Sequence, residues 1–331
     1  MSAQEYKIQL FASIQDLLWA QWTALGIPGQ MSASTPETVL DPEALLLFSA
    51  GFARYDQRLY DLILDWLQVH SSQINIQRLK ALHGKATVKD TASLGYMAAV
   101  AAETDPSRWK KPAEDYKRGT TASAALFRDQ DDVPQSFIPT GDKLALDCGF
   151  SRNRRRNSEK IPAKLPNRTA ALLLRMRGLL GISARAETIL ILLTSTRCTV
   201  QDIVDRSGFS WKSVQDVLEE LAAGGYVSSV DGIARGKVYL LNSPEKLRKL
   251  FDVQKCLFPN WSNIFDSIGL LWQTVSNPNL RKVSAETFQN ELRRIYRDEL
   301  QTKFLSSGHA ALGKADLNVS DFPKSIRLLG K

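Results

Sequence analysis

The chain has 331 residues, of which 44% are hydrophobic and 24% are charged, and its mean hydropathy is −0.22. This length predicts two or three domains, and the composition is typical of a soluble globular protein. No apolar run reaches the ~18 to 20 residues that a membrane span needs, and the N-terminus has no signal-peptide pattern. The three cysteines are too few and too scattered for a secreted disulfide framework, so we expect a cytoplasmic protein.

The net charge of +8 favours a polyanionic partner, and its distribution along the chain is uneven. Residues 106–182 carry 16 Lys and Arg against 8 Asp and Glu, a net charge of +8, whereas residues 1–105 have a net charge of −4. Residues 183–242 have a net charge of −1, and residues 243–331 one of +5. The basic excess therefore lies beside residues 183–242, not within them.

Residues 1–105 predict an N-terminal helical domain. Apolar residues recur at helical spacing between residues 9 and 25, from the Asp41-Pro42 start onward, and again between residues 53 and 70. Shorter helices are predicted at 75–82 and 91–103. Three of these helices mimic the order of a helix-turn-helix, but the net charge of −4 and the absence of a hairpin pattern favour packing or dimerisation over DNA reading.

Residues 106–182 predict a basic, proline-containing connector that ends in a lead-in helix at 169–180. One or two strands are expected within the connector, for instance Lys143 to Cys148. Its densest run of positive charge begins with four arginines and continues with Lys160 and Lys164. The arginines are Arg152, Arg154, Arg155 and Arg156. The run fits either a solvated loop or an arm that contacts DNA phosphates.

Residues 183–242 predict three short helices followed by a hairpin. Ser183 is placed to cap the first helix, Thr199 with Asp202 the second, and Ser210 the third. Gly208 provides a turn between the last two helices. The hairpin strands are expected at 226–230 and 237–241, joined at the tight-turn dipeptide Asp231-Gly232.

The third of these helices, residues 210–223, is strongly amphipathic. Val214, Val217, Leu218 and Leu221 repeat at i, i+3, i+4 and i+7 and predict its buried face. At 100° per residue, Lys212, Gln215, Asp216 and Glu219 point the opposite way, while Trp211 and Ser213 lie at the edges. The residues predicted to contact DNA are Ser210, Lys212, Ser213, Gln215 and Asp216 on the helix, and Arg235 and Lys237 on the hairpin.

This order resembles the winged-helix transcriptional regulators, over about 60 residues of the chain. The resemblance implies a mainly α (α+β), multi-domain protein with a central winged helix-turn-helix that reads double-stranded DNA. The stretches ARYDQRLYDLILDWL and PNRTAALLLRMRGLLGISARAETILILL are also similar to uncharacterised winged-helix proteins linked with nucleotidyltransferase-type toxin partners. That similarity implies an antitoxin-like repressor role.

Residues 243–331 predict a C-terminal helical domain that starts at Ser243-Pro244. Residues 308–314 match the spacing of a phosphate-binding loop, but Ala315 stands where a magnesium-binding hydroxyl is needed, so we do not read a nucleotide site there. No histidine or cysteine spacing predicts a metal site, and no catalytic motif appears. We therefore expect neither an enzyme nor a cofactor.

The sequence thus favours a DNA-binding repressor that acts as a homodimer, because a two-fold pair doubles the contacts of one near-neutral reader on a palindromic site. The alternative is a protein-interaction scaffold in which residues 183–242 dock a protein partner. The net charge of −1 and the outward Asp216 and Glu219 support that alternative.

Overall fold

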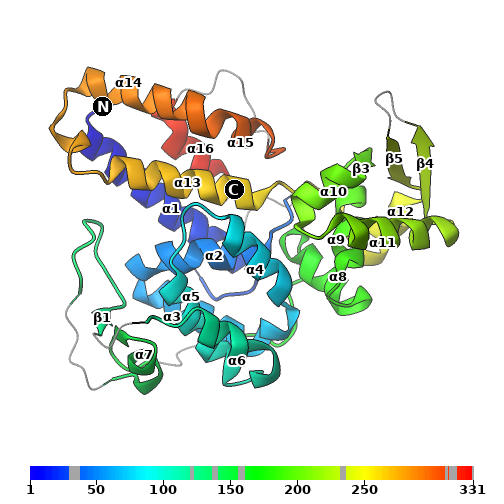
Figure 1. Cartoon of the computed structure of the whole chain (residues 1–331), viewed down its shortest axis with the longest axis horizontal. Coiled ribbons are helices and arrows are strands. Elements are labelled where there is room, and N and C mark those ends of the chain that lie inside the picture. Colours follow the sequence, from blue (N-terminus) through cyan, green and yellow to red (C-terminus); the bar gives the residue numbers. More distant parts are fainter. Residues whose placement is uncertain are drawn as a thin grey trace.

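The computed structural model describes residues 1–29, 38–119, 123–135, 141–155, 161–231, 236–309, 312 and 319–329. Helices dominate this part of the chain, and the strands form two small sheets. Figure 1 shows the helices of the N- and C-terminal segments side by side, with residues 172–251 at the opposite end of the molecule.

The N-terminal segment is helical, as predicted. Its helices are α1 (Ala3–Ala24), α2 (Pro42–Phe52), α3 (Gln57–His70), α4 (Ile76–Lys85) and α5 (Thr91–Ala102). Asp41 caps α2 by accepting a hydrogen bond from the Ala44 N–H at 3.0 Å, and Pro42 follows in the first turn. The rings of Trp22 and Trp66 meet edge-to-face at 5.2 Å in the core.

The C-terminal helices pack directly on this segment. They are α13 (Trp261–Val275), α14 (Ala285–Ile295), α15 (Gln301–Leu305) and α16 (Phe322–Leu329), and α16 lies along α1 while α13 contacts α1 and α2 (Figure 1). The Trp261 indole donates to the Val39 carbonyl at 2.7 Å, and the Tyr6 hydroxyl donates to the Val319 carbonyl at 3.0 Å. Residues 1–105 and 243–331 therefore share one hydrophobic core.

The expected connector contains more structure than its sequence predicts. It forms α6 (Pro106–Asp115), β1 (Ala124–Ala125), α7 (Lys143–Asp147), β2 (Phe150–Ser151) and α8 (Leu172–Leu180), and β1 pairs with β2 in parallel. The predicted strand at Lys143 to Cys148 is wrong, because Asp142 caps a short helix there by accepting from the Ala145 N–H at 2.9 Å. The predicted lead-in helix is confirmed as α8 with a 3₁₀ turn before it.

Residues 183–242 form the predicted helices and hairpin. The elements are α9 (Ala184–Thr194), β3 (Cys198–Thr199), α10 (Val200–Ser207), α11 (Trp211–Ala223), β4 (Val227–Asp231) and β5 (Lys237–Leu241), followed by α12 (Pro244–Phe251). The antiparallel sheet has the order β3-β5-β4. We call residues 183–242 the α9–β5 module.

The predicted caps of the module are confirmed. The Asp202 N–H donates to the Thr199 hydroxyl at 3.1 Å while the Thr199 N–H donates to the Asp202 carboxylate at 2.8 Å. Gly208 ends α10 in the left-handed conformation with φ 75°, and the Ser210 hydroxyl accepts from the Ser213 N–H at 3.2 Å to start α11. Within the described ranges, no helix has both the length and the apolar character to cross a membrane.

Candidate nucleic-acid interface

Helix α11 presents one polar face to solvent, as its periodicity predicts. Val214, Val217, Leu218 and Leu221 are buried, while Lys212, Asp216, Glu219 and Glu220 are exposed and Ser213 and Gln215 are half-buried. Trp211, predicted at the edge of the face, is 52% exposed. This exposed indole ring at the start of the helix can contact a partner, either nucleic acid or protein.

Three of the polar side chains on α11 are already engaged. The Gln215 amide donates to the Glu219 carboxylate at 2.7 Å, and Glu220 forms an ion pair with Arg185 of α9. Lys212 and Asp216 make no ion pair with any described residue. The first turn of α11 therefore offers one available cation, and the following turn offers an available carboxylate.

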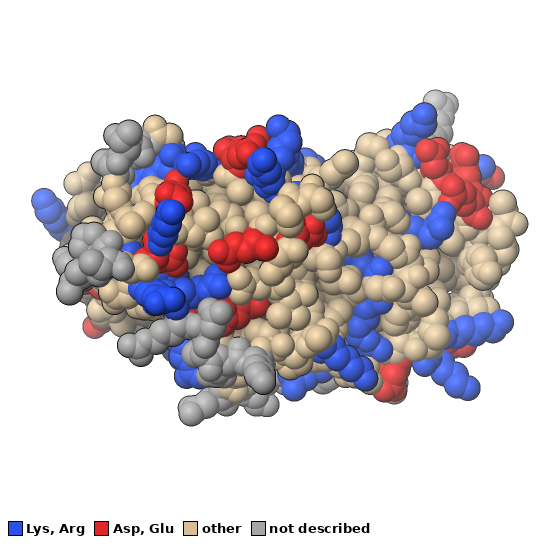
Figure 2. Space-filling model, turned by 90° about the horizontal axis from the view of Figure 1, so that it is seen from below, with Lys and Arg blue, Asp and Glu red and all other residues tan. Residues whose placement is uncertain are grey.

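Lys237 lies on the hairpin, at the exposed start of β5. Lys237 stands directly opposite Asp231 in the register of the two strands, so a carboxylate partly offsets its charge. Arg235 and the predicted turn residue Gly232 lie outside the described residues. Figure 2 shows both acidic and basic side chains at the right-hand end of the molecule, where the module lies.

The predicted basic arm does not form as one solvent-facing feature. Arg152 is 1% exposed, and its guanidinium forms an ion pair with Asp61 of α3 at 2.6 Å. The expectation that Arg152 contacts phosphate is therefore wrong, because its guanidinium is buried in the helical core and paired there with Asp61. Arg155 is half-buried, 4.0 Å from Asp65, whereas Arg154 is exposed. Arg156 and Lys160 lie outside the described residues.

A buried network of five charges lies behind the module. Arg78 of α4 donates to Asp41 and to Glu43, each at 2.6 Å, and Arg177 of α8 donates to Glu43 at 2.6 Å and pairs with Glu187 of α9 at 2.5 Å. All five side chains are at most 3% exposed. The network joins α2, α4, α8 and α9 in the interior.

Electrostatics within this network favour the ionised carboxylates. Burial raises the pKa of Glu43, but hydrogen bonds and charge from Arg177 and Arg78 outweigh burial and lower that pKa to about 2. Arg78 also donates to the Ser207 carbonyl at 2.6 Å, at the last residue of α10. The network thus holds the C-terminus of α10 just before the turn at Gly208.

The sequence did not single out Arg78, Glu43 or Glu187. Asp41 and Glu43 read as ordinary residues of a helix start, and Arg78 as one charge on an amphipathic helix. No local spacing distinguishes a buried charge from a solvated one, because the partners come from distant helices.

The described residues hold no group of three or more His, Cys, Asp or Glu that fits a metal ion. Cys148, Cys198 and Cys256 are free and buried, and burial raises the pKa of each thiol. These thiols are therefore core residues. Comparison with protein families, with curated proteins and with solved structures finds no match to this chain.

Proposed function

We propose that the α9–β5 module is a winged helix-turn-helix and that the protein is a cytoplasmic DNA-binding regulator of transcription. The carrying observation is the order helix, strand, helix, helix and hairpin with sheet order β3-β5-β4. In this arrangement the start of α11 is exposed and α11 contacts β4 of the hairpin. Readers of the major groove combine an exposed helix start with a flanking hairpin.

In this proposal the N-terminal half of α11 enters the major groove. Lys212 and Gln215 read base edges, Ser210 and Ser213 contact the backbone nearby, and Lys237 of the hairpin holds a phosphate. Asp216 lies one turn after Lys212, where a carboxylate accepts from a cytosine amino group and would otherwise be repelled by phosphates. The acidic character of α11 predicts weak nonspecific affinity, because few counterions are released on binding.

The test is a selection from random duplexes of about 30 base pairs, followed by fluorescence-anisotropy titrations at several salt concentrations. Lys212→Ala should cost about 1–3 kcal/mol at one base position of the selected site. Lys237→Ala should weaken binding to all duplexes alike and lower the salt slope by about 0.9. Lys110→Ala, on the exposed surface of α6, is the matched control and should change neither quantity. No enriched sequence, or equal effects of Lys212→Ala and Lys110→Ala, would refute the groove assignment.

A second candidate is a protein-docking role, including an antitoxin-like one, and a specific observation favours it. The exposed face of α11 carries Asp216, Glu219 and Glu220 against Lys212 alone, and Trp211 stands beside them. An exposed aromatic ring with carboxylates fits a basic protein surface. The double variant Asp216→Lys, Glu219→Lys separates the two roles: it should strengthen binding to every duplex if α11 faces DNA, and abolish capture of a basic partner if α11 docks protein.

A further inference from the structure

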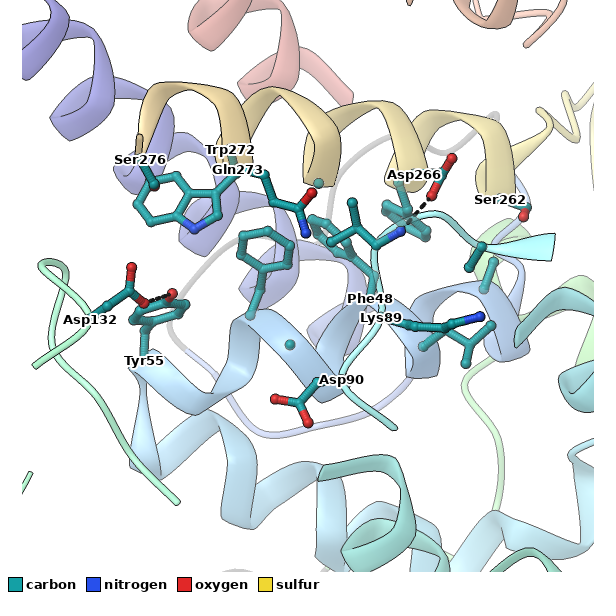
Figure 3. A pocket seen from close by; sticks show the side chains of 18 of the residues that line it. Phe48, Tyr55, Lys89, Asp90, Asp132, Ser262, Asp266, Trp272, Gln273 and Ser276 are labelled. Carbon is teal, nitrogen blue, oxygen red and sulfur yellow. Dashed lines mark hydrogen bonds between the residues drawn. The ribbon is translucent and has the colours of Figure 1, made fainter. Parts of the chain in front are cut away.

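A cavity of about 540 Å³ lies between α2 and α13, and none of its described lining residues belongs to the α9–β5 module. Residues 86–90 close one end of it, and Tyr55 and Asp132 stand at the other end (Figure 3). The volume falls within the range of about 300–1,000 Å³ that small-molecule sites occupy.

Aromatic rings form its walls. Phe48 and Phe52 project from successive turns of α2, and Phe265 and Trp272 project from α13. The Phe48 and Phe265 rings stack with centroids 4.6 Å apart, and the Trp272 ring meets Phe52 edge-to-face at 6.1 Å. Such walls favour a flat, unsaturated ligand, because rings gain from stacked and edge-to-face contacts beyond area burial.

One polar stripe of α13 also faces the cavity. Ser262, Gln273 and Ser276 line it, and Figure 3 shows the Gln273 side chain extending from α13 toward α2. The Ser276 hydroxyl is buried and has no hydrogen-bond partner among the described residues. A buried hydroxyl without a partner carries a free-energy cost, and a turn of the Ser276 side chain toward the cavity would let a ligand group relieve it.

Two of the three carboxylates around the cavity are paired with cations. Asp266 accepts from the Thr87 N–H at 2.7 Å and from Lys303 at 2.8 Å, and Asp90 pairs with Arg54. Asp132 accepts the Tyr55 hydroxyl, as Figure 3 shows. Asp266 and Asp90 therefore need no ligand cation, whereas Asp132 keeps its negative charge.

The cations of the rim are less well matched. Arg128 is one of the lining residues, its side chain is 38% exposed, and its guanidinium lies 4.0 Å from the Asp132 carboxylate. Lys89 lies at the opposite end and donates to the His83 carbonyl. A carbonyl is neutral, so this hydrogen bond does not neutralise the ammonium charge. Lys7 already lies 5.2 Å from the Trp272 ring centroid, outside the cavity lining. With Asp90 and Asp266 paired, Arg128 and Lys89 outweigh Asp132 at the rim, which favours an anion over a cation.

We propose that this cavity binds a planar aromatic anion of low molecular weight. The aromatic walls take its ring, Arg128 takes its carboxylate or sulfonate, and Gln273 and Ser276 orient it through hydrogen bonds. Arg suits this task because its planar fork of N–H donors matches a carboxylate.

A glycine in α2 provides a direct way to fill the cavity. A Cβ added to Gly51, which lines the cavity, would meet no atom within 4 Å, so a larger side chain enters open space. Gly84 of α4 is likewise helical with nothing within 4 Å, but it does not line the cavity. Leucine at either position removes a helix glycine, so both variants gain similar helix propensity and differ only in blocking the cavity.

The experiment is isothermal titration of the full chain with 1-naphthoate and with the matched cation 1-naphthylmethylammonium. We expect naphthoate to bind at least 10-fold more tightly than the cation. Gly51→Leu should weaken naphthoate binding at least 10-fold, and Gly84→Leu should leave it unchanged. Arg128→Gln should remove the preference for the anion while the ring still binds. Far-UV circular dichroism of each variant confirms its fold.

Three results would overturn the proposal. They are no heat of naphthoate binding at millimolar concentration, a cation that binds as tightly as the anion, and equal effects of Gly51→Leu and Gly84→Leu. Arg128 stands at the rim, so its variant tests the anion preference even if Gly51→Leu perturbs α2.

Discussion

Replacing Arg78 by methionine should destabilise the protein severely, because its guanidinium is the centre of the buried network. Arg78 makes hydrogen bonds of 2.6 Å to Asp41, to Glu43 and to the Ser207 carbonyl, and its side chain is 1% exposed. Methionine keeps much of the apolar stem but leaves Asp41 without its cation. Removing one partner of a buried ion pair typically costs about 3–5 kcal/mol of the free energy of unfolding.

The assay is urea unfolding followed by circular dichroism and tryptophan fluorescence, with Lys80→Met as the matched control on the same helix. Lys80 pairs with Asp115 at 2.9 Å, but both side chains are 37% exposed, so its loss should cost at most about 1 kcal/mol. Hydrogen exchange should also show faster exchange of the amides in α10, whose last carbonyl loses its donor. If the two variants lose stability equally, the network does not carry the stability assigned to it.

The same variant should change the response to acid. The pKa of Glu43 in the folded protein is about 2, below its ordinary value of 4.5. A carboxyl with a lowered folded-state pKa stabilises the fold above the unfolded-state pKa, and this contribution is lost as pH falls from 4.5 toward 2. Arg78→Met removes part of the positive charge that lowers this pKa, so the free energy of unfolding should fall less between pH 4.5 and pH 2 than it does in the parent protein. An equal fall in the two proteins over this range would contradict this reasoning.

Three further predictions concern other parts of the molecule. Burial raises the pKa of Asp65 from 3.8 to about 6, so ionisation of this group lowers the stability of the fold as pH rises from 3.8 to 6. Asp65→Asn should therefore flatten the dependence of the urea midpoint on pH in that window. An unaltered slope would contradict this prediction. Arg152→Met should lower the free energy of unfolding by about 3–5 kcal/mol, because Asp61 then loses a buried partner. Arg154 is exposed, so Arg154→Met should lower it by less than about 1 kcal/mol. Equal unfolding midpoints of the two variants would show that Arg152 is not a core residue. Sedimentation at micromolar concentration should report a homodimer, and a monomer that still binds DNA specifically would end that proposal.

Local chemistry predicts the α9–β5 module well. The caps at Thr199 and Ser210 join groups three residues apart, and the turn at Gly208 depends on one residue's conformational freedom. The buried stripe of α11 follows directly from helical periodicity. Strand β3 is missed because two residues carry no periodicity, and only pairing with β5 defines it.

Long-range pairing explains what the sequence does not predict. Four arginines within five residues look like one solvated run, yet Arg152 meets Asp61 of a helix far earlier in the chain. The sequence does not predict the cavity between α2 and α13 for the same reason, because its walls come from segments on either side of the module. Apolar stripes such as Phe48 with Phe52 predict burial equally well whether a helix or a ligand covers them.

The link between Arg177 and Glu187 means that residues 183–242 cannot simply be transplanted. An excised fragment would carry Glu187, which is fully buried, without the arginine of α8 that neutralises it. Such a fragment would have to leave this face of α9 open to water so that the carboxylate is hydrated. Glu187→Leu should then be the single change that lets the fragment fold autonomously at neutral pH, and any hybrid protein that borrows this reader would need either that substitution or α8 with it.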